Sequence, residues 1–204
     1  MLTRYPIPAA EHVFAQEIKH SRFIATVVHA PTVEQARALI ASIAARYPDA
    51  NHNCWAFHLG VGPSAVIGSS DDGEPGGTAG RPMLQVLQGS GLGDVAAVVT
   101  RYFGGIKLGS GGLARAYGGT VQKALNDLPT REQVIRRGGM LVVDYALFEQ
   151  TKRLLAHHDA LIEGEDFAVA VTLLVALPQD QWATCAAAVR ELSNGAVELV
   201  ALET

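Results

Sequence analysis

Two glycine-rich blocks constrain this chain more than any other feature of its sequence. The first reads Gly68-Ser-Ser-Asp-Asp-Gly-Glu-Pro-Gly-Gly-Thr-Ala-Gly-Arg-Pro82, and the second reads Val98-Val-Thr-Arg-Tyr-Phe-Gly-Gly-Ile-Lys-Leu-Gly-Ser-Gly-Gly-Leu-Ala-Arg-Ala-Tyr117. Glycine loses more conformational entropy on folding than any other residue, so such crowding requires positive φ angles or a close approach of the backbone to something. Because charged side chains lie among these glycines, we expect two loops that bind rather than loops that only connect.

The order of residues in the two blocks resembles the signature of the YigZ/IMPACT family. That signature runs Ser-Asp-Asp-Gly-Glu-Pro-x-Gly-Thr-Ala-Gly-x-Pro and then Thr-Arg-Tyr-Phe-Gly-Gly-x-Lys-Leu-Gly-x-Gly-Gly-Leu, and the resemblance covers residues 18–125. It implies an N-terminal domain with the α+β fold of some ribosomal proteins and of domain four of elongation factor G. It also implies a link to translation, because eukaryotic relatives regulate the translational stress response through protein partners, whereas bacterial relatives have no settled role.

The composition is that of a compact globular protein. Of the 204 residues 49 % are hydrophobic and 18 % are charged, which suits one large or two small domains. No apolar run reaches the length of a membrane span, and the first residues lack the apolar core of a signal peptide. Cys54 and Cys185 lie far apart and are interpreted as reduced, buried thiols. We therefore expect a cytoplasmic protein with no membrane partner.

Charge is distributed unevenly along the chain. The net charge is −4, yet residues 100–137 carry +5 and residues 138–204 carry −7. This asymmetry predicts one positive face on an acidic protein, which is where an anionic partner would bind. A solvated helix with a basic outer side explains the same pattern equally well.

Periodicity predicts an α+β first half. Ser110 is the expected N-cap of a long helix, and close packing on the sheet is the expected reason for Gly118 and Gly119 inside that helix. The expected strands are residues 11–19, 21–30, 51–60, 64–68 and 94–103, and the expected helices run from Thr32 to Pro48, from about Pro82 to 89, and over 110–128.

The second half predicts a separate ferredoxin-like domain. Residues 129–137 are interpreted as a linker, which gives domains 1–130 and 137–204. The order βαββαβ that follows is that of a small sheet with two helices on one face. Its expected strands are 138–145, 160–165, 167–177 and 196–202, and its expected helices are 147–159 and 179–193.

The acidic loop offers three carboxylates, Asp71, Asp72 and Glu74. Such groups hold a hard cation, take part in acid–base chemistry, contact a partner, or accept hydrogen bonds and ion pairs within the fold. We favour the last use, with Arg81 or Arg101 as the cation. We therefore expect the loop at 69–81 to pack beside the loop at 101–112.

The second loop resembles an anion site. It opens a helix, whose free N–H groups attract phosphate, and it carries Arg101, Lys107, Ser110 and Arg115. The lysine precedes the last glycines, so this is not a Walker A motif, and the block is not a dinucleotide fingerprint either. Tight packing of a strand–helix turn is the alternative explanation.

Other polar groups give weaker indications. His52, Cys54 and His58 alternate along one strand, but their spacing is no standard zinc motif and does not form a converging triad. Tyr102 and Phe103 stand next to Arg101, where they stack on bases or form the two faces of a strand. We assign no metal, no cofactor and no catalytic residue.

Two functions follow from these observations. The first is a noncatalytic, translation-linked binding protein that contacts RNA, the ribosome or a protein partner through the loops at 69–81 and 101–115. The second is an enzyme that acts on a phosphorylated small molecule or nucleotide. A deep pocket in which carboxylates converge with Lys107 would favour the enzyme, and a shallow positive surface would favour the binding protein.

Overall fold

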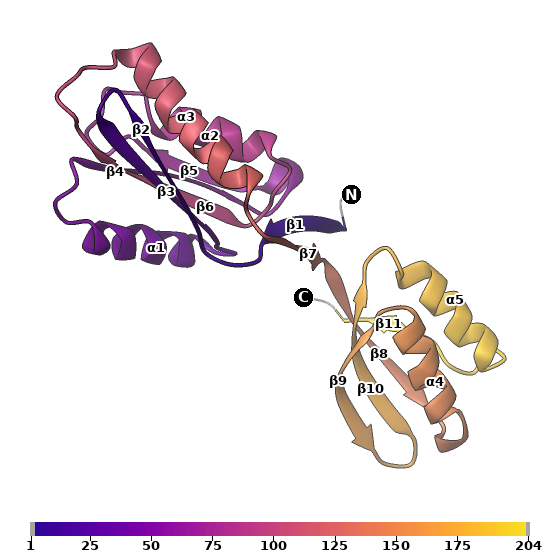
Figure 1. Ribbon diagram of the computed structural model, residues 1–204. Helices are drawn as coiled ribbons and strands as arrows, with labels where there is room; N and C mark the ends of the chain where they lie inside the picture. Colours follow the sequence, from indigo (N-terminus) through magenta and orange to yellow (C-terminus); the bar gives the residue numbers. More distant parts are fainter. Residues whose placement is uncertain (1–2, 203–204) are drawn as a thin grey trace. The chain divides into compact units, whose positions relative to one another are not determined.

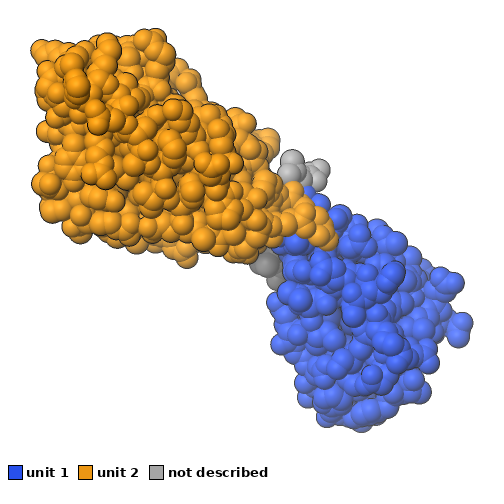
Figure 2. Space-filling view, in the orientation of Figure 1, with its two compact units in different colours: residues 1, 3, 134–204 blue, residues 2, 4–133 orange. Residues whose placement is uncertain are grey.

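The chain folds into two compact units, which confirms the expected two-domain α+β class. The computed structural model describes residues 3–202. Residues 4–133 form the N-terminal unit, and residues 134–202 together with Thr3 form the C-terminal unit (Figure 2).

The N-terminal unit is built on a five-stranded antiparallel sheet in the order β2-β3-β6-β4-β5. The central strand β6 is buried at every position from Val95 to Arg101, because both of its faces are covered. The strands are β2 (His12–Ile18), β3 (Ser21–His29), β4 (His52–Leu59), β5 (Val66–Ser70) and β6 (Val95–Tyr102).

Three helices cover this sheet. Helices α2 (Gly80–Gly89) and α3 (Ser110–Asn126) lie on one face, and α1 (Val33–Arg46) lies on the other (Figure 1). The buried side of α3 includes Tyr117 and Val121, which are completely buried. Thr32 caps α1, as expected, by accepting a hydrogen bond from the Gln35 backbone.

Two details of α3 differ from the expectation. The N-cap is Gly109, with a φ of 72°, and Ser110 is already the first helical residue. Gly118 faces Pro82 and Val86 of α2 rather than the sheet, so its small size serves the contact between the two helices.

The expectation of an unstructured linker at residues 129–137 is wrong. Residues Thr130–Val134 form strand β7, which pairs with strand β1 (Arg4–Pro8) in a separate two-stranded sheet. The backbone of Ala9 donates to the Pro129 carbonyl at 2.8 Å, next to this pairing. A short run of polar residues thus becomes a strand because a partner strand from the start of the chain satisfies its backbone groups.

The C-terminal unit has the ferredoxin-like order predicted from the sequence. Its antiparallel sheet runs β11-β8-β10-β9, and both helices pack on one face of it (Figure 1). The elements are β8 (Arg136–Val143), α4 (Tyr145–His157), β9 (Leu161–Phe167), β10 (Val171–Pro178), α5 (Trp182–Leu192) and β11 (Val200–Ala201).

Candidate functional site

The two glycine-rich loops lie side by side, as expected. The acidic loop follows β5 and the second loop follows β6, and a buried ion pair joins them. Glu74 Oε1 lies 2.5 Å from Arg101 Nη1 and accepts a second hydrogen bond from the Tyr117 hydroxyl at 2.7 Å. The Glu74 and Arg101 side chains are only 4 % and 6 % exposed, so this is a buried ion pair, and one carboxylate oxygen, Oε1, accepts both hydrogen bonds.

Asp71 braces the start of α2. Its Oδ1 accepts from the backbone N–H groups of Ala79 and Gly80 at 2.9 and 2.8 Å, and its Oδ2 accepts from that of Gly77 at 2.7 Å. Burial opposes ionisation of this carboxyl, but the three backbone hydrogen bonds outweigh it and hold the pKa of Asp71 below its ordinary value. Asp71 therefore acts as the cap of a helix whose own N-cap, Ala79, offers no side chain for the purpose.

Asp72 and Arg81 of the acidic loop are more exposed than Asp71 and Glu74. Asp72 is exposed, has a φ of 43°, and accepts a hydrogen bond from the Asn53 backbone at 2.6 Å. Arg81 is exposed on the first turn of α2 and is not the partner of Glu74. Of the three carboxylates, Asp71 therefore fixes the acidic loop to the start of α2, and Glu74 joins the two loops.

The second loop is anchored at its first residues. Phe103 donates its backbone N–H to Asn51 Oδ1 at 2.7 Å, and Gly104 donates to Ser21 Oγ at 3.2 Å. A Cβ atom at position 104 would overlap the backbone of His20, so only glycine fits there. The beginning of the loop is therefore fixed against β3 and β4.

A pocket of about 460 Å³ lies between the two loops. Its lining includes the first residue of α3 and its N-cap, Ser110 and Gly109. Gly109 has no side chain and α3 has no side-chain cap, so backbone N–H groups in its first turn remain available to an anion. The side chains that line the pocket include Asn51, His52, Glu74, Arg101, Phe103 and Lys107.

Lys107 is the cation that an anion in this pocket would meet. It is exposed, and between residues 3 and 202 no carboxylate forms an ion pair with it. His52 supplies a second polar group: its Nδ1 lies 2.7 Å from the Asp72 carbonyl oxygen, so Nδ1 carries the proton and Nε2 is left 3.9 Å from Glu74 Oε1. The pocket thus joins a free cation, a helix N-terminus and an oriented imidazole.

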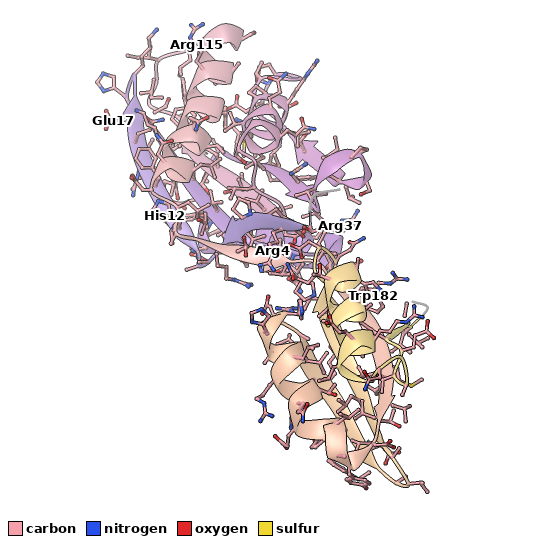
Figure 3. All side chains as sticks on the ribbon, turned by 90° about the vertical axis from the view of Figure 1, so that its right-hand side faces the viewer. Arg4, His12, Glu17, Arg37, Arg115 and Trp182 are labelled. Carbon is pink, nitrogen blue, oxygen red and sulfur yellow. The ribbon has the colours of Figure 1, made fainter. Side chains whose placement is uncertain are left out.

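Arg115 does not line this pocket. It lies on α3 (Figure 3). There it lines a groove of about 600 Å³ between α2 and α3, together with Val86 and Gly119. Helices α2 and α3 contain no acidic residue, and their three cations are Arg81, Arg115 and Lys123. Of the segment 100–137 from which a positive face is predicted, Arg115 and Lys123 lie on this helical layer.

The basic segment 100–137 does not act as one surface. Arg101 is buried under the loops and pairs with Glu74, whereas Lys107 is exposed. Arg136 and Arg137 belong to the C-terminal unit, where Arg137 lies over the Trp182 ring and Arg136 pairs with Asp159.

Cys54 and His58 of β4 are used structurally. Cys54 is buried, and its thiol donates to the Asp71 carbonyl at 2.9 Å. Burial raises the pKa of Cys54 to about 12, which makes it a poor nucleophile. His58 Nδ1 lies 3.1 Å from the Leu92 carbonyl. Across residues 3–202 no cluster of three or more metal-ligating side chains occurs, and no helix there is long and apolar enough to cross a membrane.

Sequence reasoning missed three residues of the site. Asn51, Ser21 and Tyr117 hold Phe103, Gly104 and Glu74 through side-chain hydrogen bonds. The helical spacing of Tyr117 predicts a core position. A buried tyrosine hydroxyl needs a hydrogen-bond partner, and this requirement could have indicated that Tyr117 also binds a polar group of the site. Nothing local in the sequence connects Asn51 or Ser21 to a loop more than fifty residues away.

Comparison with known proteins gives the family. The model of the Impact N-terminal domain matches residues 19–125, and that of a domain of unknown function (DUF1949) matches residues 141–196. The chain belongs to the IMPACT family. It is 44 % identical over 198 residues to IMPACT family member YigZ of Escherichia coli (strain K12), which covers 97 % of both chains.

Two further matches extend across most of the chain. IMPACT family member YvyE of Bacillus subtilis (strain 168) is 36 % identical over 187 residues, which are 92 % of this chain and 85 % of that protein. A crystal structure described as that of an hypothetical protein superposes with a TM-score of 0.73 at 43 % identity and covers 100 % of this chain and 99 % of the other. The family resemblance inferred from the two glycine-rich blocks is thus confirmed.

Proposed function

We propose that this IMPACT family member is a noncatalytic, translation-linked protein that binds phosphate groups of RNA through its N-terminal unit. The observation that carries the proposal is the position of Lys107, an unpaired cation in a pocket that also contains the uncapped start of α3. The helix N-terminus and the ammonium group attract the same ligand, because both present positive charge and hydrogen-bond donors.

The surface next to the pocket supports the same conclusion. Helices α2 and α3 add Arg81, Arg115 and Lys123 without any carboxylate, although the whole chain has a net charge of −4. Because this helical layer has cations and no acidic residues within its helices, we expect a polyanion to be attracted to it more strongly than to the rest of this acidic protein. The sugar–phosphate backbone of RNA is the polyanion that a translation-linked protein meets, so the ribosome is the proposed target.

The alternative, an enzyme acting on a phosphorylated small molecule or nucleotide, has one observation in its favour. A volume of about 460 Å³ is within the range of small-molecule sites. Glu74 is the carboxylate that lines the pocket, but it already accepts hydrogen bonds from Arg101 and Tyr117. A general base must reach the substrate, and a carboxylate that is only 4 % exposed and paired with Arg101 is poorly placed to do so. This geometry therefore favours binding over acid–base catalysis.

Ribosome cosedimentation with the full chain tests the proposal. The protein should pellet with ribosomes at low salt and be released as salt rises, since each phosphate contact frees counterions. The double variant Lys107→Ala/Arg115→Ala should bind more weakly and show a smaller salt dependence.

The matched control is Arg37→Ala, which removes an exposed cation from α1 on the opposite face of the same sheet. It should bind like the wild type. Equal loss in Arg37→Ala and in the double variant would show that only overall charge matters. Wild-type binding by the double variant would remove the pocket and the helical layer from consideration.

A further inference from the structure

Phe103 presents a large aromatic ring at the anion pocket. It follows the last residue of β6, it lines the pocket together with Lys107, and it remains 46 % exposed. A single exposed aromatic side chain is not unusual in itself. Phe103 differs because both its backbone and its side chain are held in place by contacts with other residues.

Two contacts hold Phe103 in place. Its backbone N–H donates to Asn51 Oδ1 at 2.7 Å, and the guanidinium carbon of Arg101 lies 5.5 Å from the centre of its ring. The same guanidinium lies 5.4 Å from the Phe23 ring, so buried Arg101 connects Phe103 to the core. An aromatic ring supported in this way on one side offers the rest of its surface to a ligand without the entropy cost of ordering a free side chain.

One polar group beside the ring, the side-chain amide NH₂ of Asn51, is not used by the fold. Asn51 Oδ1 is taken by Phe103, which leaves the Asn51 amide NH₂ at the pocket wall with no partner among residues 3–202. Arg101 also lines the pocket, but its terminal nitrogens bond Glu74 and Ser21 and its Nε is buried, so the Asn51 amide is the donor that a ligand reaches. A nucleobase stacks its face on an aromatic ring and forms hydrogen bonds along its edge. A free amide beside an exposed aromatic ring can serve both needs.

We propose that the pocket takes one unpaired nucleotide of a single-stranded RNA. The base stacks on Phe103 with its edge toward the Asn51 amide, and its phosphate lies between Lys107 and the start of α3. This inference rests on the proposed function and specifies which form of RNA the site accepts. A base inside a duplex has both faces covered by its neighbours, so only an unstacked base reaches Phe103.

Fluorescence anisotropy with three labelled probes of equal length tests the inference. The probes are a single-stranded RNA of ten nucleotides, the same strand in a duplex, and an abasic strand with the same number of phosphates. The single strand should bind the full-length protein more tightly than either of the other two. Phe103→Leu should weaken its binding by about 5- to 150-fold, the range measured when one stacking aromatic is removed, and should leave the abasic strand unaffected.

Two further variants separate stacking from general hydrophobic contact. Phe103→Tyr keeps the aromatic face and should restore tight binding of the single strand. Phe167→Leu removes another half-exposed aromatic, which lies in the C-terminal unit, and should change nothing. Melting temperatures of all variants, compared with the wild type, identify any that are simply unfolded.

The outcomes distinguish this inference from the proposed function. If the strands bind in a Lys107-dependent manner but Phe103→Leu has no effect, or if the duplex binds as tightly as the single strand, the stacking inference is overturned and phosphate binding stands. If neither the single strand nor the abasic strand binds the wild-type protein, both fail together.

Discussion

Glu74 and Arg101 form a buried ion pair that joins the two glycine-rich loops across 27 residues of sequence. Their side chains are 4 % and 6 % exposed, with 2.5 Å between Oε1 and Nη1. Arg101 is at the same time in contact with Phe23 and Phe103. A single residue of β6 therefore connects the acidic loop, the core and the rim of the pocket.

Removal of one member of this pair should be costly. Glu74→Ala leaves the Arg101 charge buried without its carboxylate, and the Tyr117 hydroxyl also loses its acceptor. We expect the free energy of unfolding to fall by about 3–5 kcal/mol, measured by urea denaturation.

Two controls accompany this measurement. Glu11→Ala breaks the exposed pair with Arg46 and should leave the urea midpoint nearly unchanged. The double variant Glu74→Ala/Arg101→Met removes both charges and should be less destabilised than the sum of its single variants. An additive double variant would show that the pair is not energetically coupled.

Asp71 should make stability dependent on pH in the acidic range. Its folded-state pKa lies below the ordinary value, so ionised Asp71 stabilises the fold above the unfolded-state pKa, and this contribution is lost as pH falls through the folded-state pKa. Asp71→Asn removes the charge and places an NH₂ group against one of the backbone donors that Asp71 now accepts from, so it should cost about 1–3 kcal/mol at pH 7. The difference from wild type should shrink below the ordinary pKa of an aspartate.

Asp72→Asn is the matched control for this pH series. Asp72 is exposed and bonds one backbone N–H of β4 rather than the start of a helix. Denaturant titrations from pH 7 to pH 3 should show a smaller and flatter difference for it. A constant difference for Asp71→Asn across that range would contradict ionisation as the source of the effect.

The two thiols should be unreactive in the folded protein. Burial raises the pKa of Cys54 to about 12 and that of Cys185 to about 11, and both residues are buried. At pH 8 a thiol-specific chromophoric reagent should react slowly with the native chain and rapidly, at two sites, after denaturation. Fast reaction of one thiol in the native state would show that its part of the core opens.

The sequence predicted the elements that are specified locally. Helical periodicity located α1 and α3, and the βαββαβ order of the C-terminal unit followed from alternating patterns, because side chains at fixed spacing determine which face is buried. The pairing of β1 with β7 could not be predicted, since neither short strand carries a pattern that names its partner 120 residues away.

The candidate site shows the same division. Glycine and charge crowding predicted that the loops adjoin, and the ion pair of Glu74 with Arg101 follows that expectation. The sequence did not reveal that Arg101 is buried or that Arg115 faces a different hollow from Lys107. The burial of Arg101 depends on contacts with Glu74, Ser21 and Phe23, which lie far from it in the sequence. The position of Arg115 depends on how α3 packs against α2.

Two glycines of the second block should respond to alanine in opposite directions. Gly104 lies against the backbone of His20, so Gly104→Ala forces the second loop away from β3 and should cost at least about 1–3 kcal/mol. Gly119 lies inside α3 with an ordinary φ and open space where a Cβ would be, so Gly119→Ala should stabilise the chain by about 0.5–1 kcal/mol through helix propensity. Thermal and urea unfolding of the two variants measure the contrast. Stabilisation by Gly104→Ala would show that the second loop is not anchored on β3, and the anchoring of Phe103 at the pocket would then need another explanation.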